Sequence, residues 1–152
     1  MNPERVTVRP LRETDLDGWF RLRKMLWDAT GDNDHKSEMI DILDHHETQL
    51  VLVAEDGETG RLVGFLEASI RPLVEDCDTD HVGYLEGWYV EPGFRKQGVG
   101  SQLVRHAENW AREKGCTEMA SDAEIGNNSS LAAHQSLGYI ETSRLVHLRK
   151  DL

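Results

Sequence analysis

The sequence contains little cysteine and no long apolar segment. Its two cysteines, Cys77 and Cys116, fit neither a disulfide framework nor a structural zinc site, so both thiols are expected to be reduced. No hydrophobic run approaches the roughly 20 residues of a membrane-spanning helix. The N-terminal residues MNPERVTVRP lack the apolar core of a secretion signal. These features predict a cytoplasmic protein that does not associate with membranes.

Positive charge is also scarce. The chain has 17 Lys and Arg residues against 28 Asp and Glu residues, which gives a net charge of −11. Proteins that bind nucleic acids usually present a basic surface, so this balance argues against such a partner. An acidic cleft would concentrate a cationic small molecule, although many acidic proteins are simply soluble. His45 and His46 would point about 100° apart on a helix, so no metal site is expected.

The order of predicted elements indicates a mixed α/β fold with an α+β-type mixed sheet, forming one domain over residues 1–152. A chain of this length can bury a sizeable core. Periodicity predicts strands over 6–10, 50–55, 62–71, 81–90, 118–122 and 139–149. It predicts helices over 15–28, from a cap at Ser37 onward, over 99–114 and over 129–137.

A glycine-rich segment, VEPGFRKQGVGS at 90–101, lies between a predicted strand and the longest predicted helix. Glycines let backbone N–H groups converge there, and a helix start adds about half a positive charge. Arg95 and Lys96 strengthen that field, so the segment is typical of an anion-binding loop. A nucleotide P-loop would need a lysine where Val99 stands, and a dinucleotide fingerprint would need other glycine spacings. A glycine-rich turn with incidental charge is the remaining alternative.

Arg95, Gly98 and Gly100 form the pattern R-x-x-G-x-G, which resembles the coenzyme-binding loop of the GNAT acyltransferases. The predicted element order resembles that of the same family. The resemblance implies a GNAT-type fold with splayed central strands, and acetyl-CoA as cosubstrate with no metal. It assigns coenzyme binding to Trp88, Tyr89, Val90, Arg95, Lys96, Gln97, Gly98, Val99, Gly100, Ser101 and Asn127.

Five further strings are similar to one branch of that family, the aminoglycoside 6′-N-acetyltransferases. They are LRKMLW at 22–27, EASIR at 67–71, YLEGWYV at 84–90, CTEMASDAE at 116–124 and HQSLGY at 134–139. The resemblance implies acetyl transfer to the 6′-amine of an aminoglycoside, an antibiotic-resistance activity, in a homodimer. It implies that Trp27, Glu86, Asp122 and Glu141 contact the substrate, with Glu86 and Asp122 also catalytic.

The same residues have other interpretations when taken alone. Strand alternation places Glu86 and Trp88 on one face, and Gly87 suggests a bulge or a close backbone approach. Glu86 on its own suggests an exposed strand carboxylate. Asp122 would bind an ammonium group or cap a turn, and Trp27 would suit the core as well as a substrate wall.

The sequence also departs from the related enzymes. Val74 and Ser143 stand where those enzymes carry an aromatic residue and a glutamate, so no drug preference is predicted. The acidic segment at 74–80 would either attract a polycation or form a solvated loop. His134 occupies the place of a tyrosine that serves many GNAT enzymes as general acid. It would either protonate a thiolate or lie on a helix surface.

We expect direct attack of the amine on the thioester, because Cys116 has no evident activating partner. Deprotonating an amine of pKa ~10 costs about 4 kcal/mol at neutral pH. Alignment can supply ~7–11 kcal/mol, so Glu86 and Asp122 should chiefly position the amine. Backbone donors near Trp88 would stabilise the oxyanion. The alternatives are acetylation of a polyamine or a protein N-terminus, and a non-catalytic module that binds acetyl-CoA.

Overall fold

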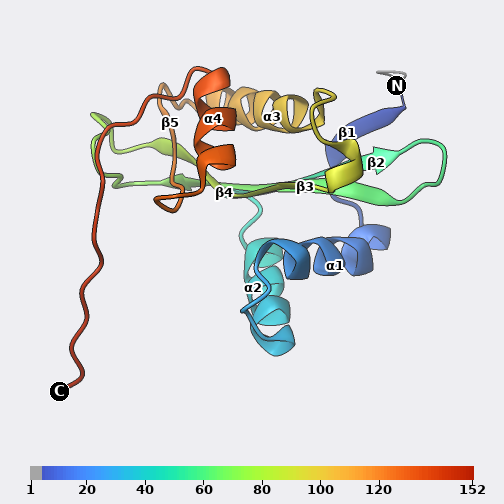
Figure 1. Ribbon diagram of the computed structural model, residues 1–152, viewed down its shortest axis with the longest axis horizontal. Coiled ribbons are helices and arrows are strands. Elements are labelled where there is room, and N and C mark those ends of the chain that lie inside the picture. Colours follow the sequence, from blue (N-terminus) through green and yellow to red (C-terminus); the bar gives the residue numbers. More distant parts are fainter. Residues whose placement is uncertain (1–4) are drawn as a thin grey trace.

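The computed structural model describes residues 5–152 and contains a five-stranded sheet with helices on both faces (Figure 1). The strand order is β1-β2-β3-β4-β5, and the first four strands pair in antiparallel fashion. β5 is parallel to β4, which makes the sheet mixed as predicted. The strands are β1 (Val6–Pro10), β2 (Gln49–Asp56), β3 (Leu62–Arg71), β4 (Val82–Val90) and β5 (Met119–Ser121).

Two helices cover each face of the sheet (Figure 1). α1 (Leu16–Leu26) and α2 (Asp32–Asp44) lie on one side, and α3 (Val99–Glu113) and α4 (Asn128–Ser136) lie on the other. The central strand β3 is buried on both faces because its side chains alternate. Phe65 therefore packs with Trp19 of α1, whereas the next residue, Leu66, packs with Leu103 of α3.

The second helix begins earlier than its sequence pattern predicts. α2 starts at Asp32 with Gly31 as N-cap, whereas the sequence suggests a start at Ser37. Asp32 and Asp34 occupy its first turn, where their negative charge favours the positive end of the helix dipole. The polar residues that suggest a loop thus form the first turn of the helix.

The C-terminal segment is not a strand. Residues 139–152 form neither helix nor strand, and beyond Tyr139, which packs against the core, the segment leads away from the body of the molecule (Figure 1). The prediction of a strand over 139–149 is therefore wrong for this chain on its own. A strand requires a neighbouring edge for its N–H and C=O groups, and within residues 5–152 none lies beside this segment. Its apolar side chains Leu145, Val146 and Leu148 remain exposed.

Of the helices within residues 5–152, none has the length and apolar character needed to cross a membrane.

Candidate active site

A bulge in β4 sets the geometry of the candidate site. Glu67 of β3 pairs with Gly87, and the next pair involves Leu85, so Glu86 has no partner across the ladder. The bulge suggested by Gly87 is thus confirmed. One extra residue reverses the alternation of side chains beyond it. Glu86 therefore faces the helices α1 and α2, whereas Trp88 packs with the α3 cluster. The prediction that Glu86 and Trp88 share a face is wrong for this reason.

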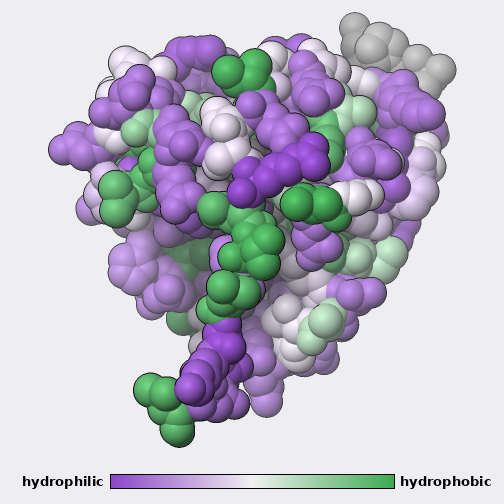
Figure 2. Space-filling model, turned by 60° about the vertical axis from the view of Figure 1, so that its left-hand side comes forward, coloured by the Kyte–Doolittle hydropathy of each residue, from purple (hydrophilic) through white to green (hydrophobic). Residues whose placement is uncertain are grey.

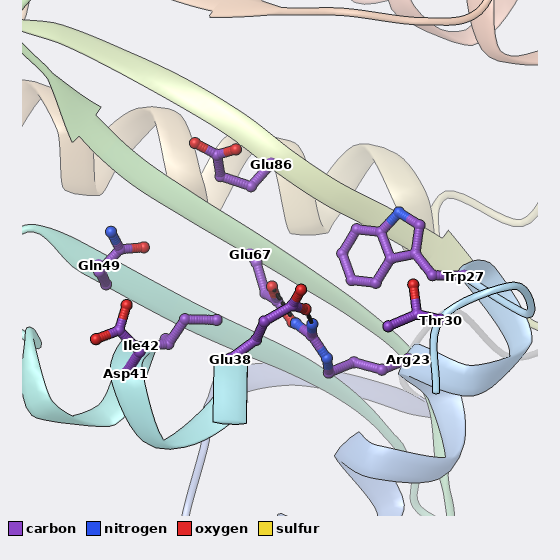
Figure 3. A pocket seen from close by; sticks show the side chains of 9 residues that line it. All are labelled: Arg23, Trp27, Thr30, Glu38, Asp41, Ile42, Gln49, Glu67 and Glu86. Atoms are coloured by element: carbon purple, nitrogen blue, oxygen red, sulfur yellow. Dashed lines mark hydrogen bonds and ion pairs between the residues drawn. The ribbon is translucent and has the colours of Figure 1, made fainter. Parts of the chain in front are cut away.

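The ring of Trp27 lies against this bulge. A Cβ added at Gly87 would lie 2.4 Å from Cη2 of Trp27, so only glycine leaves room for the ring. The guanidinium of Arg23 lies 4.7 Å from the Trp27 ring centroid, and the ring of Phe65 meets it edge-on at 5.9 Å. Trp27 thus packs on the core and at the same time forms a wall beside Glu86 (Figure 3).

A cavity of about 360 Å³ opens between this wall and the helix α2 (Figure 3). Four of its lining residues are carboxylates and one is an arginine, so a cationic ligand is favoured there. Sequence reasoning missed Glu38 and Asp41, because acidic residues on a helix usually mark a solvated face. The lining residues are Arg23, Trp27, Thr30, Glu38, Asp41, Ile42, Gln49, Glu67 and Glu86.

A buried ion pair forms the floor of the cavity. Arg23 donates to Glu67 at 2.6 Å, and Trp19 donates its indole N–H to the same carboxylate at 2.8 Å. Nε of Arg23 also donates to Nδ1 of His35 at 3.2 Å, so the proton of His35 is on Nε2. That Nε2–H donates to the carbonyl of Trp27 at 3.1 Å and fixes the start of the α1–α2 loop.

Glu86 is held by three hydrogen bonds at the cavity wall. Its Oε1 accepts from Ser69 Oγ at 2.7 Å and from Arg71 Nε at 2.8 Å, and its Oε2 accepts from Arg71 Nη2 at 2.6 Å. The side chain is 29% exposed. Glu86 is thus a half-buried, oriented group rather than a free carboxylate on an exposed strand.

Asp122 directly follows β5, at the point where the sheet opens. β4 and β5 pair only over three positions, the last of which joins Leu85 to Ser121. The hydroxyl of Tyr84 donates to Oδ2 of Asp122 at 2.6 Å. Burial and the neighbouring carboxylate raise the pKa of Tyr84 well above its usual range, so its hydroxyl remains a donor. Asp122 lies outside the cavity lining and is oriented by Tyr84 rather than capping a turn.

The glycine-rich loop has the geometry of an anion site. Gly98 adopts φ +85° immediately before α3, and within residues 5–152 no side chain caps that helix start. The first-turn N–H groups of a helix have no intrahelical acceptor, and in the described part of this chain no capping side chain takes its place. Lys96 adopts φ +61°, and Nε of Arg95 donates to the carbonyl of Val90 at 2.7 Å. This bond uses only Nε of Arg95, and the two terminal nitrogens of its guanidinium are not part of it.

The aromatic residues after the bulge pack at this helix start. A Cβ added at Gly100 would lie 3.2 Å from Cζ2 of Trp88, so the indole lies on the first turn of α3. Tyr89 faces the opposite side of the sheet and lies under the guanidinium of Arg95, with 5.5 Å between guanidinium and ring centroid. These contacts fix the loop relative to β4.

Two predicted site residues have local partners instead. The side chain of Asn127 accepts from the backbone N–H of Ser130 at 3.2 Å and caps α4. Glu141 forms an ion pair with Arg144 in the C-terminal segment, away from the cavity lining. The coenzyme contact of Asn127 and the substrate contact of Glu141 stay predictions.

His134 is packed rather than displayed on a helix surface. Its ring meets that of Trp88 edge-on at 5.2 Å and lies against Tyr139. Its Nδ1–H donates to the carbonyl of Ser130 at 2.7 Å, so Nε2 accepts from Ser121 Oγ at 2.8 Å. Both ring nitrogens of His134 therefore have partners.

Comparison with known proteins identifies this architecture. Residues 19–139 match the acetyltransferase (GNAT) family. The chain belongs to this family. The acetyltransferase is 43% identical over 149 residues to the aminoglycoside N(6′)-acetyltransferase type 1 of Klebsiella aerogenes, covering 95% of this chain and 96% of that relative. It is 40% identical to the protein of the same name from Salmonella typhimurium, covering 94% and 97%.

Solved structures agree with this assignment. The acetyltransferase superposes on the aminoglycoside 6′-N-acetyltransferase of Acinetobacter haemolyticus with a TM-score of 0.88 and 39% identity, covering 96% of this chain and 99% of that one. AAC(6′)-Iy, solved with the bisubstrate analogue CoA-S-monomethyl-acetylneamine, gives a TM-score of 0.90 and 38% identity, covering 97% and 99%. The expected GNAT fold and its resemblance to the aminoglycoside branch are confirmed.

Proposed function

We propose that this acetyltransferase transfers the acetyl group of acetyl-CoA to the 6′-amine of an aminoglycoside antibiotic. The observation that carries the proposal is the acidic cavity on the β4 bulge, in a chain nearly co-extensive with relatives that bear this name. A polycationic sugar suits a cavity with four carboxylates, one tryptophan wall and an adjoining gap in the sheet.

Coenzyme A would bind along β4 and the loop that follows. The helix start and Arg95 would hold the pyrophosphate, and the gap beyond Leu85 would admit the pantetheine arm. This arrangement is supported by AAC(6′)-Iy, which has been solved with CoA. The residues assigned to this site are Trp88, Tyr89, Val90, Arg95, Lys96, Gln97, Gly98, Val99, Gly100, Ser101 and Asn127.

The reaction would proceed by direct attack of the amine on the thioester carbonyl carbon. Trp27 and Glu86 would position the substrate, and Asp122 or a water beside it would accept the amine proton. The backbone N–H groups near Trp88 would stabilise the oxyanion before the thiolate leaves. A covalent acyl-enzyme is disfavoured at Cys116, because burial raises the pKa of its thiol.

The acetyltransferase would act as a homodimer. The C-terminal segment extends from the body beyond Tyr139 with Leu145, Val146 and Leu148 exposed, and Figure 2 shows hydrophobic side chains gathered along this segment. A second copy would cover these side chains and provide hydrogen-bond partners for the extended backbone. Light scattering of the full chain, and of a chain truncated after Tyr139, would give a dimer and a monomer respectively.

We place the enzyme in the cytoplasm, where acetyl-CoA is available. Cys77 and Cys116 are both free, as expected for a reducing compartment. Cell fractionation with an antibody against the chain would locate it, and recovery with secreted proteins would contradict this placement.

The substrate class is tested by thiol release from acetyl-CoA with purified protein. We expect turnover with a kanamycin-type aminoglycoside at least tenfold faster, in kcat/KM, than with spermidine or a peptide with a free N-terminus. Preference for spermidine would identify a polyamine acetyltransferase. Binding of acetyl-CoA without turnover of any amine would identify a non-catalytic module.

A further inference from the structure

We propose that Tyr84 and Arg71 are positioning residues that orient Asp122 and Glu86 as one unit. This inference rests on the proposed function, in which both carboxylates act on the substrate amine. It assigns a role to two residues that contact the carboxylates and not the reacting atoms.

Arg71, the last residue of β3, is fixed from two sides. Its Nε and Nη2 form a two-pronged contact with the carboxylate of Glu86, at 2.8 and 2.6 Å. Its guanidinium also lies 3.7 Å above the ring centroid of Tyr84. A planar guanidinium can form both contacts at once, whereas a lysine ammonium cannot reproduce the two-pronged geometry. Glu86 and the Tyr84 ring therefore share one partner.

Tyr84 continues this link to the neighbouring strand. It lies two residues before Glu86, ahead of the bulge, so both side chains are on the same face of β4. The Tyr84 residue is only 7% exposed, and its hydroxyl donates to Asp122 at 2.6 Å. The contacts thus run from Glu86 through Arg71 and Tyr84 to Asp122, from β3 and β4 to the residue that follows β5.

The link lies where ordinary sheet pairing ends. Beyond Leu85 and Ser121 the ladder between β4 and β5 stops, so strand pairing does not orient the side chain of Asp122. Within residues 5–152, the hydroxyl of Tyr84 is the only side-chain donor to the Asp122 carboxylate. Without that hydroxyl the carboxylate is free to rotate, and misplacement by about 1 Å can cost on the order of 10²-fold in rate.

The charges along this link also give the two carboxylates, Glu86 and Asp122, different roles. The negative charge of Glu86 is balanced by Arg71, whereas Asp122 forms no ion pair within residues 5–152. The substrate ammonium therefore meets its unbalanced counter-charge at Asp122, and Glu86 serves mainly as an oriented hydrogen-bond acceptor. Tyr84 keeps the charged group fixed beside the point where the pairing of β4 and β5 ends.

A double-mutant cycle tests this proposal. Tyr84→Phe removes one hydroxyl and keeps the ring under Arg71. We expect it to weaken kanamycin binding, measured by calorimetry with CoA bound, at least fivefold, and to leave acetyl-CoA affinity within twofold. In an Asp122→Asn background the same change should alter drug affinity by less than twofold, because its partner carboxylate is already gone.

Tyr139→Phe is the matched control. Tyr139 is a half-buried tyrosine whose hydroxyl, like that of Tyr84, donates to a carboxylate, that of Glu108 at 2.8 Å. It should lower thermal stability as much as Tyr84→Phe while leaving drug affinity unchanged. Equal losses of drug affinity in Tyr84→Phe and Tyr139→Phe would overturn the positioning role alone. So would an equal loss of drug affinity on adding Tyr84→Phe to the unmodified protein and to Asp122→Asn. Failure of the unmodified protein to bind kanamycin would overturn the proposed function as well.

Arg71→Lys provides a second test that does not depend on removing a hydroxyl. It keeps the charge beside Glu86 but loses the two-pronged contact and the ring contact. We expect kcat to fall at least threefold in Arg71→Lys. Adding Tyr84→Phe to that variant should lower kcat by less than a further twofold. Wild-type kcat in Arg71→Lys would show that only the charge matters and would overturn the coupling.

Discussion

The indole ring of Trp27 lies directly on the backbone of Gly87, with no room for a methyl group between them. This contact joins the end of α1 to the bulge that turns Glu86 toward the cavity. The substrate wall and the opening of the sheet are therefore parts of one local structure, and a change at either residue should alter substrate recognition.

Gly87→Ala tests that relationship. The added methyl group would displace Trp27, so we expect the KM for the aminoglycoside to rise at least tenfold and the free energy of unfolding to fall by about 1–3 kcal/mol. Steady-state kinetics and urea denaturation measure the two effects. Gly83→Ala is the control, because its methyl group would meet Met119 Sδ at 2.5 Å on the opposite side of β4. Equal KM changes in both variants would contradict the wall assigned to Trp27.

Asp122→Asn should separate substrate binding from coenzyme binding. The change removes the unbalanced negative charge at the end of β5, so kcat/KM for aminoglycosides should fall at least tenfold. The dissociation constant for acetyl-CoA, measured by calorimetry, should stay within twofold. Asp80→Asn removes an exposed charge from the β3–β4 loop and should change neither value. Parallel losses for both ligands would show that Asp122 has a structural role instead.

Arg95→Gln should weaken coenzyme binding in a salt-dependent way. Its guanidinium is anchored to the Val90 carbonyl through one nitrogen, and its other nitrogens would meet the pyrophosphate. We expect the acetyl-CoA affinity to fall at least fivefold at low salt and the difference to shrink at high salt. Arg112→Gln, at the far end of α3, is the control for net charge. An unchanged affinity for acetyl-CoA in Arg95→Gln would contradict the assignment of this loop to coenzyme binding.

Arg23 should be indispensable for stability. Its side chain is 2% exposed and Glu67 lies buried against it, so Arg23→Met leaves an unpaired carboxylate in the core. The free energy of unfolding should fall by about 3–5 kcal/mol. Replacing Glu67 by leucine in the same protein should recover part of that loss, as measured by urea denaturation. If the free energy of unfolding falls less in Arg23→Met than in the double variant, the stabilising role of the Arg23–Glu67 ion pair is contradicted.

Acid should weaken the fold through Asp56. Bonds from Arg5 and Thr59 hold the pKa of the Asp56 carboxyl well below its ordinary value of 3.8. Because the folded-state pKa is the lower one, this stabilisation is fully present above pH ~4 and is lost as the pH falls through the folded value. The urea midpoint should fall from pH 5 to pH 2 less steeply in Asp56→Asn than in the unmodified protein. Parallel curves would contradict this role.

Much of the fold follows from local sequence patterns. The alternating apolar residues of 62–71 predict β3 with the bounds that the structure shows, and Gly87 predicts the bulge. The loop before α3 is also evident, because Gly98 and the adjacent cations form a short, local motif. In each case the physical cause lies within a few neighbouring residues.

Other features depend on contacts between distant residues. The bulge reverses the strand faces, so simple alternation misplaces Trp88 relative to Glu86. The link between Tyr84 and Asp122 joins residues 38 positions apart, and no local motif marks it. The segment at 139–149 has the composition of a strand, but within residues 5–152 it pairs with no strand of the sheet.

The central claim is acetyl transfer to a 6′-amine, and the most direct test compares two aminoglycosides that differ at that position alone. Thiol release from acetyl-CoA should be observed with the drug that bears a 6′-amine and should be absent with its 6′-hydroxyl analogue. Mass spectrometry should show one acetyl group on the first drug. Acetylation of both drugs, or of neither, would contradict the 6′-N-acetyltransferase assignment.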